Sequence, residues 1–291
     1  MCAWCSGASP RVSRAATINS RNRKQDRRKS MSDPLVKIAR DGHVVTLTLN
    51  NPPVNALSSA VLEALIAALD TVEAEGEARC VILTGTGEKA FSAGGDLRQE
   101  RDFGGPEAAK AFRELGRRTL NRLEGYFVPV VSAIHGYCIG GGTAIGWVCD
   151  IRIAADNAVF RAGDAYIGMV PSWGMGLTRL PRLVGRNRAL DILLIGENFD
   201  AKTAQELGLV TKVVQREKLM EEATAIARRI SKASPNAIRA TREAIAFNMR
   251  EGWSAMAQFE EEICQQVFSH PDAHEGPKAF TEKREPVFAR I

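Results

Sequence analysis

The sequence predicts an α/β fold, and three features of the chain lead to this prediction. Short apolar runs with the composition of buried strands recur over the first two thirds of the chain. Segments with the periodicity of amphipathic helices separate these runs. The 291 residues are 45% hydrophobic and 25% charged, which is enough apolar material for a sizeable core. Strands that alternate with helices in this way are typical of α/β proteins.

Strands are predicted where apolar or β-branched runs stop at turn residues. The first, Val44–Leu49, ends at a cluster of two asparagines and two prolines. The others cover residues 80–84, 130–134, 151–154 and 158–160. Ser58 or Ser59 can cap a helix that follows the first strand and runs through Asp70, because leucine and isoleucine recur there with helical spacing.

After about residue 200 the pattern becomes helical. Helices are predicted over residues 201–207, 218–232, 235–250 and 253–268, and the last strand over residues 208–214. We expect three parts: a basic, disordered leader at 1–30, an α/β core at 31–222 and a helical C-terminal section at 223–291. No apolar stretch approaches the roughly 18 residues that a membrane span needs, so no membrane association is predicted.

Residues 1–30 carry the positive charge of the chain. They hold eight basic residues and one acidic residue, a net charge of +7, and the whole chain has +5, which leaves −2 for residues 31–291. The predicted core therefore gives no reason to expect nucleic-acid binding. Three interpretations of the leader remain: a disordered arm or an extension upstream of a start at Met31, a mitochondrial transit peptide, or a nucleic-acid-binding tail. The predicted compartment is the cytoplasm, or the mitochondrion if the leader is a transit peptide.

The cysteines and acidic residues do not predict a metal site. Cys2 and Cys5 form a C-x-x-C pair, but no second pair of ligands follows at matching spacing. We therefore interpret this pair as a chance occurrence. No cluster of histidine, aspartate and glutamate has the spacing of metal ligands either.

Two glycine clusters, at residues 90–97 and 135–144, each follow a predicted strand. Glycine lets a ligand approach the backbone closely, and a helix start supplies unpaired N–H groups at a positive dipole end. Two such loops brought together can direct two N–H groups at one oxyanion. The alternative is that both clusters are close-packed turns. The P-loop, dinucleotide-binding and serine nucleophile-elbow motifs are absent from the sequence.

These glycine clusters are part of an ordered set of motifs that resembles the crotonase family, the enoyl-CoA hydratase/isomerase superfamily. The resemblance runs over essentially all of residues 35–291. The matching positions are residues 51–57, 91–97, 140–142 and 149–151, Phe160, residues 168–171 and 180–185, Gly196, Ala201, Ala204, residues 208–210 and 234–235, and residues 275–280. Each motif alone is weak, and their order along the chain carries the resemblance.

The resemblance implies a crotonase-like spiral of ββα units with a helical C-terminal trimerisation section. The assembly it implies is a homotrimer or a dimer of trimers. It also implies an acyl-CoA thioester as substrate, so that coenzyme A is part of the substrate and no cofactor is needed. The backbone N–H groups of Gly95 and Gly141 match the family's oxyanion hole, which stabilises the thioester enolate.

Several residues match the positions at which the family binds the CoA moiety. Ala56, Ala93 and Arg98 lie at such positions near the two glycine clusters. Phe280 and Lys283 match a C-terminal segment that meets CoA from the same or a neighbouring subunit. A cation beside a phosphate makes electrostatic sense, and an ordinary surface charge is the alternative for both basic residues.

The sequence departs from the family pattern at the catalytic acids. Family hydratases hold a water molecule between two glutamates, and the first of these positions is Ala144, which cannot transfer a proton. The second is Asp164, whose shorter side chain draws the carboxylate back by about 1.5 Å. Asp164 is therefore the predicted acid/base, as a lone acid at this position is what the family's isomerases use. The alternative is a carboxylate that caps a helix or forms a salt bridge, which Arg161 three residues earlier favours.

Other polar residues are weaker candidates for catalysis. Asp96 and Asp150 match positions that hold loops in the family. Glu100 and Asp102 follow Asp96 closely and could reach a pocket. His135 precedes the second glycine cluster, and we interpret it as a packed loop residue.

The sequence thus predicts an acyl-CoA-processing enzyme, with an isomerase or atypical hydratase favoured over a hydrolase or decarboxylase of the same family. Trp173 is the predicted lining of its acyl pocket, because a large ring there would shape the cavity. One rival is a non-catalytic CoA-ester-binding protein, which Ala144 favours. Another is an RNA-binding member that uses the basic leader. The sequence does not define the acyl chain.

Overall fold

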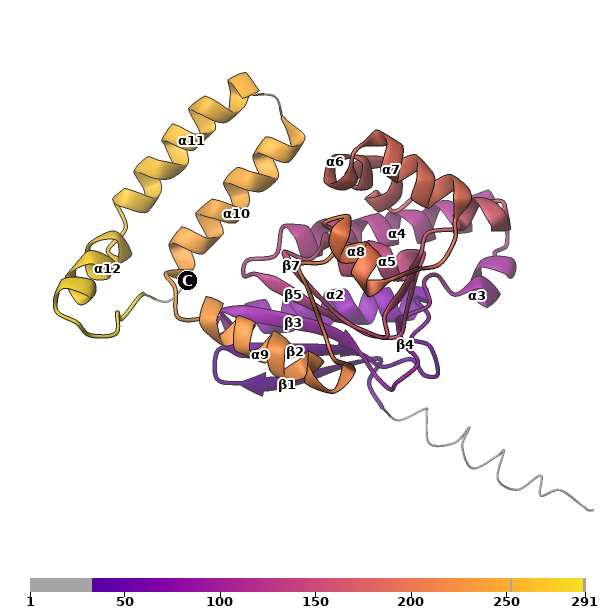
Figure 1. The fold of residues 1–291 in the computed structure, drawn as a ribbon, viewed down its shortest axis with the longest axis horizontal. Coiled ribbons are helices and arrows are strands. Elements are labelled where there is room, and N and C mark those ends of the chain that lie inside the picture. The colour runs from indigo at the N-terminus through magenta and orange to yellow at the C-terminus, as the bar shows by residue number, and fades with distance from the viewer. Residues whose placement is uncertain (1–32, 252, 290–291) are drawn as a thin grey trace, which may run out of the picture. The chain divides into compact units, whose positions relative to one another are not determined.

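Six strands form the larger of two sheets, near the centre of the view in Figure 1. The computed structural model describes residues 33–251 and 253–289, so the predicted leader, with Cys2 and Cys5, lies outside the described residues. In spatial order the strands are β1 (Val36–Asp41), β2 (Val44–Leu49), β3 (Cys80–Gly85), β5 (Val130–Ile134), β7 (Ile151–Ala155) and β10 (Lys212–Val214). The β1–β2 pair is an antiparallel hairpin, and every other pairing in this sheet is parallel.

The second sheet consists of short strands, and it reveals the repeating unit of the fold. Its order is β4 (Ala90–Ser92), β6 (Tyr137–Ile139), β8 (Val159–Arg161) and β9 (Phe199–Asp200). The pairs β3/β4, β5/β6 and β7/β8 each place one strand in each sheet, and helices follow the first two pairs: α3 (Leu97–Arg101), α4 (Pro106–Glu124) and α5 (Gly141–Val148). The predicted α/β fold and its spiral of ββα units are confirmed.

The larger sheet is covered on both faces, which explains why its strands are apolar throughout. In β3, Val81 and Leu83 pack into the cluster that contains α2 (Ser59–Glu75), whereas Cys80 and Ile82 pack with α9 (Leu219–Ile230). Successive strand residues point to opposite faces, so a strand buried on both sides reads as a continuous apolar run. The predicted boundary at residue 222 falls inside α9.

The helix predicted after the first strand forms, but it is longer than the sequence analysis indicates. Ser58 is its N-cap, and its hydroxyl accepts a hydrogen bond from Val61 N at 3.3 Å. The helix continues past Asp70 to Glu75 and ends at Gly76, which has φ +66°. A glycine at this position is a common helix stop, because it adopts the left-handed conformation without steric strain.

α4, β4 and β6 are among the elements that the sequence pattern did not predict. The buried face of α4 includes Gly116 and Thr119 beside Phe112 and two leucines, so its apolar stripe is interrupted. Both missed strands have three residues and lie inside the glycine clusters. Short strands in glycine-rich sequence carry little periodicity, and only their neighbours in the sheet reveal them.

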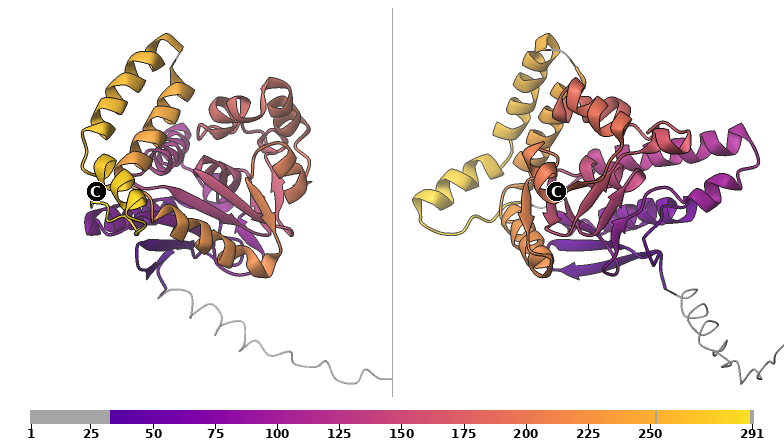
Figure 2. Two further views of the ribbon diagram at one scale, coloured as in Figure 1. Left: turned by 60° about the vertical axis from the view of Figure 1, so that its left-hand side comes forward. Right: turned by 45° about the vertical axis from the view of Figure 1, so that its right-hand side comes forward.

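The C-terminal part is helical, as predicted. It contains α10 (Pro235–Arg250), α11 (Trp253–Phe268) and α12 (Asp272–Thr281), whereas α8 (Ala201–Glu206) precedes β10 in the α/β part. Figures 1 and 2 show α10 and α11 side by side as an antiparallel pair, in which the Phe247 and Phe259 rings stack with centroids 4.2 Å apart. The role of this section in trimer formation stays a prediction. Among the described helices, none is both long and apolar enough to cross a membrane.

Arg242 attaches α10 to the α/β part. Its Nε donates to Asp150 Oδ1 at 2.8 Å, and its other nitrogens donate to the carbonyl oxygens of Tyr126 and Glu124. Asp150 Oδ2 in turn accepts from Val130 N at 2.8 Å, at the start of β5. One guanidinium thus joins α10, the end of α4 and the central sheet.

We predict that Arg242→Ala lowers the free energy of unfolding by about 2 kcal/mol, because it leaves a half-buried carboxylate and two carbonyl groups without their donor. Urea unfolding followed by circular dichroism measures this loss. Arg239→Ala is the matched control on the same helix, since the contacts of Arg239 with Glu243 at 3.9 Å and with Asn236 Oδ1 at 3.4 Å are exposed. Equal effects of the two substitutions would contradict this role of Arg242.

Candidate active site

A cavity of about 740 Å³ opens beside both glycine clusters. The loops after β4 and β6, helices α4 and α5, and the segment after β8 form its walls, which are mainly apolar. A volume of this size suits a small-molecule ligand. Of the residues predicted from the sequence, five line the cavity: Ala93, Gly95, Gly141, Asp164 and Trp173.

The two glycine loops approach each other so closely that only glycine fits between them. A Cβ on Gly94 would lie 2.5 Å from Ile139 O and 3.0 Å from Gly141 N, and Gly94 has φ +88°. A Cβ on Gly142 would overlap the carbonyl oxygen of Ser92. The glycines are therefore required by packing, and the same packing brings Gly95 and Gly141 to one wall of the cavity.

The backbone N–H groups of Gly95 and Gly141 are unpaired. Within residues 33–251 and 253–289, neither group donates a hydrogen bond to the protein, whereas Gly94 N donates to Ser92 Oγ at 3.2 Å and Gly140 N donates to Arg161 O at 2.9 Å. Gly141 is the first residue of α5, where the helix leaves N–H groups without partners and the dipole is positive. The two donors can therefore receive a negatively charged oxygen.

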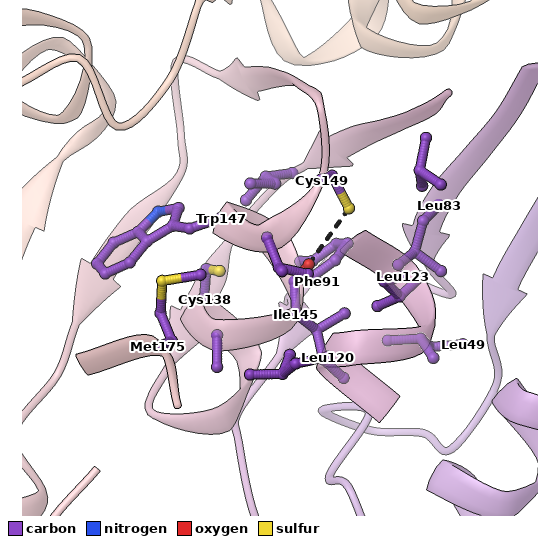
Figure 3. Close-up of a cluster of buried hydrophobic side chains, with 14 of the residues drawn as sticks. Leu49, Leu83, Phe91, Leu120, Leu123, Cys138, Ile145, Trp147, Cys149 and Met175 are labelled. Carbon is purple, nitrogen blue, oxygen red and sulfur yellow. Dashed lines mark hydrogen bonds between the residues drawn. The ribbon is translucent and has the colours of Figure 1, made fainter. Parts of the chain in front are cut away.

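Helix α5 is held rigidly behind the second donor. Every residue from Gly142 to Val148 is buried. Figure 3 shows Ile145 of this helix among Leu120 and Leu123 of α4, with Trp147 on the opposite side of the cluster. A helix fixed on all sides cannot move its first N–H away from the cavity without disturbing the core, so this donor is preorganised.

Asp164 begins a short 3₁₀ helix, η1 (Asp164–Ile167), and lines the cavity. Burial raises the pKa of its carboxyl group above the usual aspartate range. The proposed structural partner does not hold it, because Arg161 Nε donates to Gly196 O at 2.7 Å. Within the described part of the chain, Asp164 forms no ion pair. Ala144, the other family position, is buried and also lines the cavity, where it presents only a methyl group.

Glu100 and Asp102, which the sequence pattern did not distinguish, lie in different surroundings in the structure. Glu100 lines the cavity, and its Oε1 occupies the space that a Cβ on Gly95 would take. Burial and, to a lesser degree, the charges of Asp164 and Asp96 raise the pKa of Glu100. Asp102 instead pairs with Arg101 at 2.7 Å on the exposed side of the chain. The position of Glu100 one turn after the N-cap of α3 is visible in the sequence. The sequence pattern does not show that its side chain points into the cavity.

Trp173 closes one wall of the cavity. Its side chain is buried, and its ring meets that of Phe112 edge-on with centroids 5.5 Å apart. A Cβ on Gly141 would lie 2.7 Å from Cζ3 of this ring, and a Cβ on Gly116 would overlap it. The indole thus packs directly against the helix start that carries the second N–H donor.

The remaining predicted binding residues lie outside the cavity lining. Ala56 is half-buried, and its carbonyl oxygen accepts from Asn51 Nδ2 at 2.7 Å. Arg98 is exposed on α3. Phe280 is 85% exposed at the end of α12, and Lys283 is exposed just beyond it. Their contacts with CoA stay predictions.

The other polar candidates have structural partners. Asp96 is the N-cap of α3 and accepts from Arg98 N at 3.0 Å. His135 is buried, with Nε2 at 2.9 Å from Gly87 O, and burial lowers its pKa. Over the described residues, no group of three or more histidine, cysteine, aspartate or glutamate side chains could hold a metal ion.

Comparisons with known proteins identify the family of this chain. Residues 39–290 match the family model "Enoyl-CoA hydratase/isomerase". A probable enoyl-CoA hydratase from Bacillus subtilis is 35% identical over 254 residues, which are 87% of this chain and 98% of the relative. A short-chain-enoyl-CoA hydratase from Clostridium acetobutylicum is 37% identical over 86% of this chain and 95% of its own. The crystal structure of an enoyl-CoA hydratase from Bacillus anthracis has a TM-score of 0.83 and 36% identity over 87% of this chain and 98% of its own. The chain therefore belongs to the enoyl-CoA hydratase/isomerase family and is an enzyme of the hydratase/isomerase type.

Proposed function

We propose that the protein acts on an acyl-CoA thioester through an enolate, which the N–H groups of Gly95 and Gly141 stabilise while Asp164 moves the proton. One observation carries this proposal. Two unpaired backbone donors lie at the wall of a cavity that also holds a carboxylate without an ion pair among the described residues. Donor and base are the two things that proton abstraction next to a thioester carbonyl requires.

The donors would act on the charge that develops during the reaction. When the proton next to the carbonyl is removed, the electron pair moves onto the thioester oxygen. Each N–H group that meets this oxygen in a cavity shielded from water contributes about 3–4 kcal/mol to the stability of the transition state. The start of α5 adds its dipole to the same position.

Asp164 suits the role of the base. Burial raises the pKa of its carboxyl group, which makes it a stronger base than an exposed aspartate. Arg161 is engaged with Gly196, so its charge is not paired with this carboxylate.

Ala144 is the residue by which we rank the reactions that this site could catalyse. Hydration of a 2-enoyl-CoA in this family uses a second carboxylate from α5, where this chain has a methyl group. We therefore favour isomerisation of a 3-enoyl-CoA to a 2-enoyl-CoA or an atypical hydration, and place thioester hydrolysis and decarboxylation after them. A protein that binds CoA esters without turning them over is the rival that Ala144 favours.

Four predicted residues outside the cavity lining bear on how CoA binds and how the subunits assemble. We propose that Arg98, Ala56, Phe280 and Lys283 contact CoA in an assembled homotrimer or dimer of trimers, and that no separate cofactor is needed. We further propose the cytoplasm as the compartment, with the mitochondrion as the alternative if residues 1–30 direct import.

We predict that Asp164→Asn lowers kcat for both hex-3-enoyl-CoA and hex-2-enoyl-CoA by about a hundredfold or more, because the amide cannot accept the proton. The absorbance of the conjugated thioester follows both reactions, and calorimetry measures whether CoA-ester binding is kept. If the intact protein binds both esters and converts neither, the binding-protein alternative replaces the enzymatic proposal.

We also predict that Asp164→Asn raises the melting temperature at pH 7 and leaves it unchanged below about pH 4. The folded-state pKa of Asp164 is raised, so its ionisation destabilises the folded protein as the pH rises above the unfolded-state pKa of about 3.9. Asp102→Asn is the control, since the hydrogen bond from Arg101 lowers the pKa of Asp102 and its loss should not stabilise the protein. Thermal unfolding between pH 3.5 and 8 measures both variants; a lower melting temperature for Asp164→Asn at pH 7 would contradict the assigned burial.

We predict that Gly142→Ala lowers kcat by about a hundredfold, because the new methyl group pushes the loop after β4 off the start of α5 and separates the two donors. Gly104→Ala is the matched control, since a Cβ there meets nothing within 4 Å. Steady-state rates on hex-3-enoyl-CoA distinguish the two variants. Full activity in Gly142→Ala would show that the reaction does not depend on this loop contact.

A further inference from the structure

A second carboxylate shares the cavity with Asp164, and it comes from a different part of the chain. Glu100 lies on α3, directly after the loop that carries Gly95. The side chain and the backbone carbonyl of Asp96 both hold the first turn of this helix. Asp96 caps it, and Glu100 N donates to Asp96 O at 2.9 Å.

A side-chain clamp also holds α3 against the beginning of α2. Gln99 Oε1 accepts from Ser59 N at 2.9 Å, and Gln99 Nε2 donates to Ser59 Oγ at 2.8 Å. Because Gln99 is the residue before Glu100, the clamp fixes the backbone from which the carboxylate extends. Glu100 is therefore not a free surface side chain.

The carboxylate of Glu100 turns back towards the first oxyanion donor. Its Oε1 fills the position of a missing Cβ on Gly95, and Phe112 Cε1 lies 3.7 Å from the same position. The lack of a side chain at Gly95 therefore leaves room for the Glu100 carboxylate. The acid stands beside the place where the thioester oxygen would bind.

The charges around Glu100 favour its neutral form. Among the described residues it pairs with no cation, and its neighbours Arg101 and Asp102 pair with each other. The other charged side chains that line the cavity are Arg113, Arg161 and Asp164. Asp96, the N-cap of α3, is not part of the lining. Burial and the two acidic neighbours raise the pKa of Glu100. Two carboxylates that line one cavity repel each other when both are ionised, which favours the state in which one of them holds a proton.

We propose that Glu100 is the second proton-transfer group of this active site and supplies the acid that is missing at Ala144. This inference rests on the proposed enolate chemistry of Gly95, Gly141 and Asp164. In it, the second carboxylate comes from α3 rather than from α5.

Each step of the 3-enoyl to 2-enoyl conversion balances with these two groups. The Asp164 carboxylate takes a proton from Cα, the C–H bond breaks, and its electron pair forms the dienolate on the thioester oxygen. Neutral Glu100 then gives its proton to Cγ, so that a C–H bond forms there, the double bond moves between Cα and Cβ, and the carbonyl is restored. Asp164 is left neutral and Glu100 ionised. Asp164 then releases its proton to water and Glu100 takes one up from water, which completes the cycle.

The fate of the proton removed from Cα differs between a mechanism with Asp164 alone and one with Asp164 and Glu100. If Asp164 alone acted, the proton removed from Cα would return to Cγ of the same molecule. With Glu100 as the donor, the proton at Cγ comes from a group that has equilibrated with solvent. Hex-3-enoyl-CoA with both Cα positions deuterated should therefore lose one deuterium to water in each turnover by the intact enzyme, keep the other at Cα, and gain protium at Cγ.

The test compares Glu100→Gln with Asp102→Asn, an exposed neighbour outside the cavity. We expect Glu100→Gln to lower kcat on hex-3-enoyl-CoA by about a hundredfold with KM changed less than about threefold, and its residual product to retain deuterium at Cγ. Asp102→Asn should match the intact enzyme in rate and in loss of label. Melting temperatures and calorimetric binding of the CoA ester establish that each variant is folded and competent to bind.

The outcomes separate this inference from the proposed function. Full activity and unchanged label loss in Glu100→Gln, beside an inactive Asp164→Asn, would overturn the role of Glu100 and leave the enolate chemistry standing. High retention of label by the intact enzyme would overturn it as well. An intact enzyme that binds the ester and does not isomerise it would remove the proposed function and this inference together.

Discussion

The close approach of the loops after β4 and β6 is the constraint on which the site depends. These strands are parallel neighbours, with Ala90 paired to Tyr137 and Ser92 to Cys138, so their chains leave the sheet at the same edge. Gly94 and Gly142 let the two loops touch, since side chains there would collide with backbone atoms of the opposite loop. The contact brings the N–H groups of Gly95 and Gly141 to one cavity. The remaining core, packed around α5, keeps them there (Figure 3).

The same arrangement explains the electrostatic character of the cavity. Donors fixed in the backbone attract negative charge, whereas burial makes the two carboxylates resist it. The balance favours an anion that forms on the substrate and is held by the N–H groups. This design costs stability, because each buried carboxylate without an ion pair among the described residues weakens the folded state at neutral pH. Stability lost at a site of this kind is a common accompaniment of activity.

The sequence predicted most of the fold because the long elements have clear patterns. β2, β5, α10 and α11 have the predicted bounds, since each is an unbroken apolar or amphipathic run between turn residues. α4 escaped prediction because Gly116 and Thr119 interrupt its buried stripe. In the site, the glycines and Asp164 follow from motif position, whereas Glu100 does not. Its direction depends on the cap at Asp96 and the clamp at Gln99, which are tertiary contacts that no periodicity records.

Exchange of the Cα proton with solvent reports enolate formation at this site whatever reaction follows. The bound CoA ester of a saturated or 3-enoyl acid is incubated in D₂O with the enzyme, and NMR follows deuterium entering Cα. We predict exchange by the intact enzyme and exchange at least about a hundredfold slower in Asp164→Asn. Binding of the ester with no exchange above the rate in buffer, or equal exchange in both proteins, would contradict this prediction.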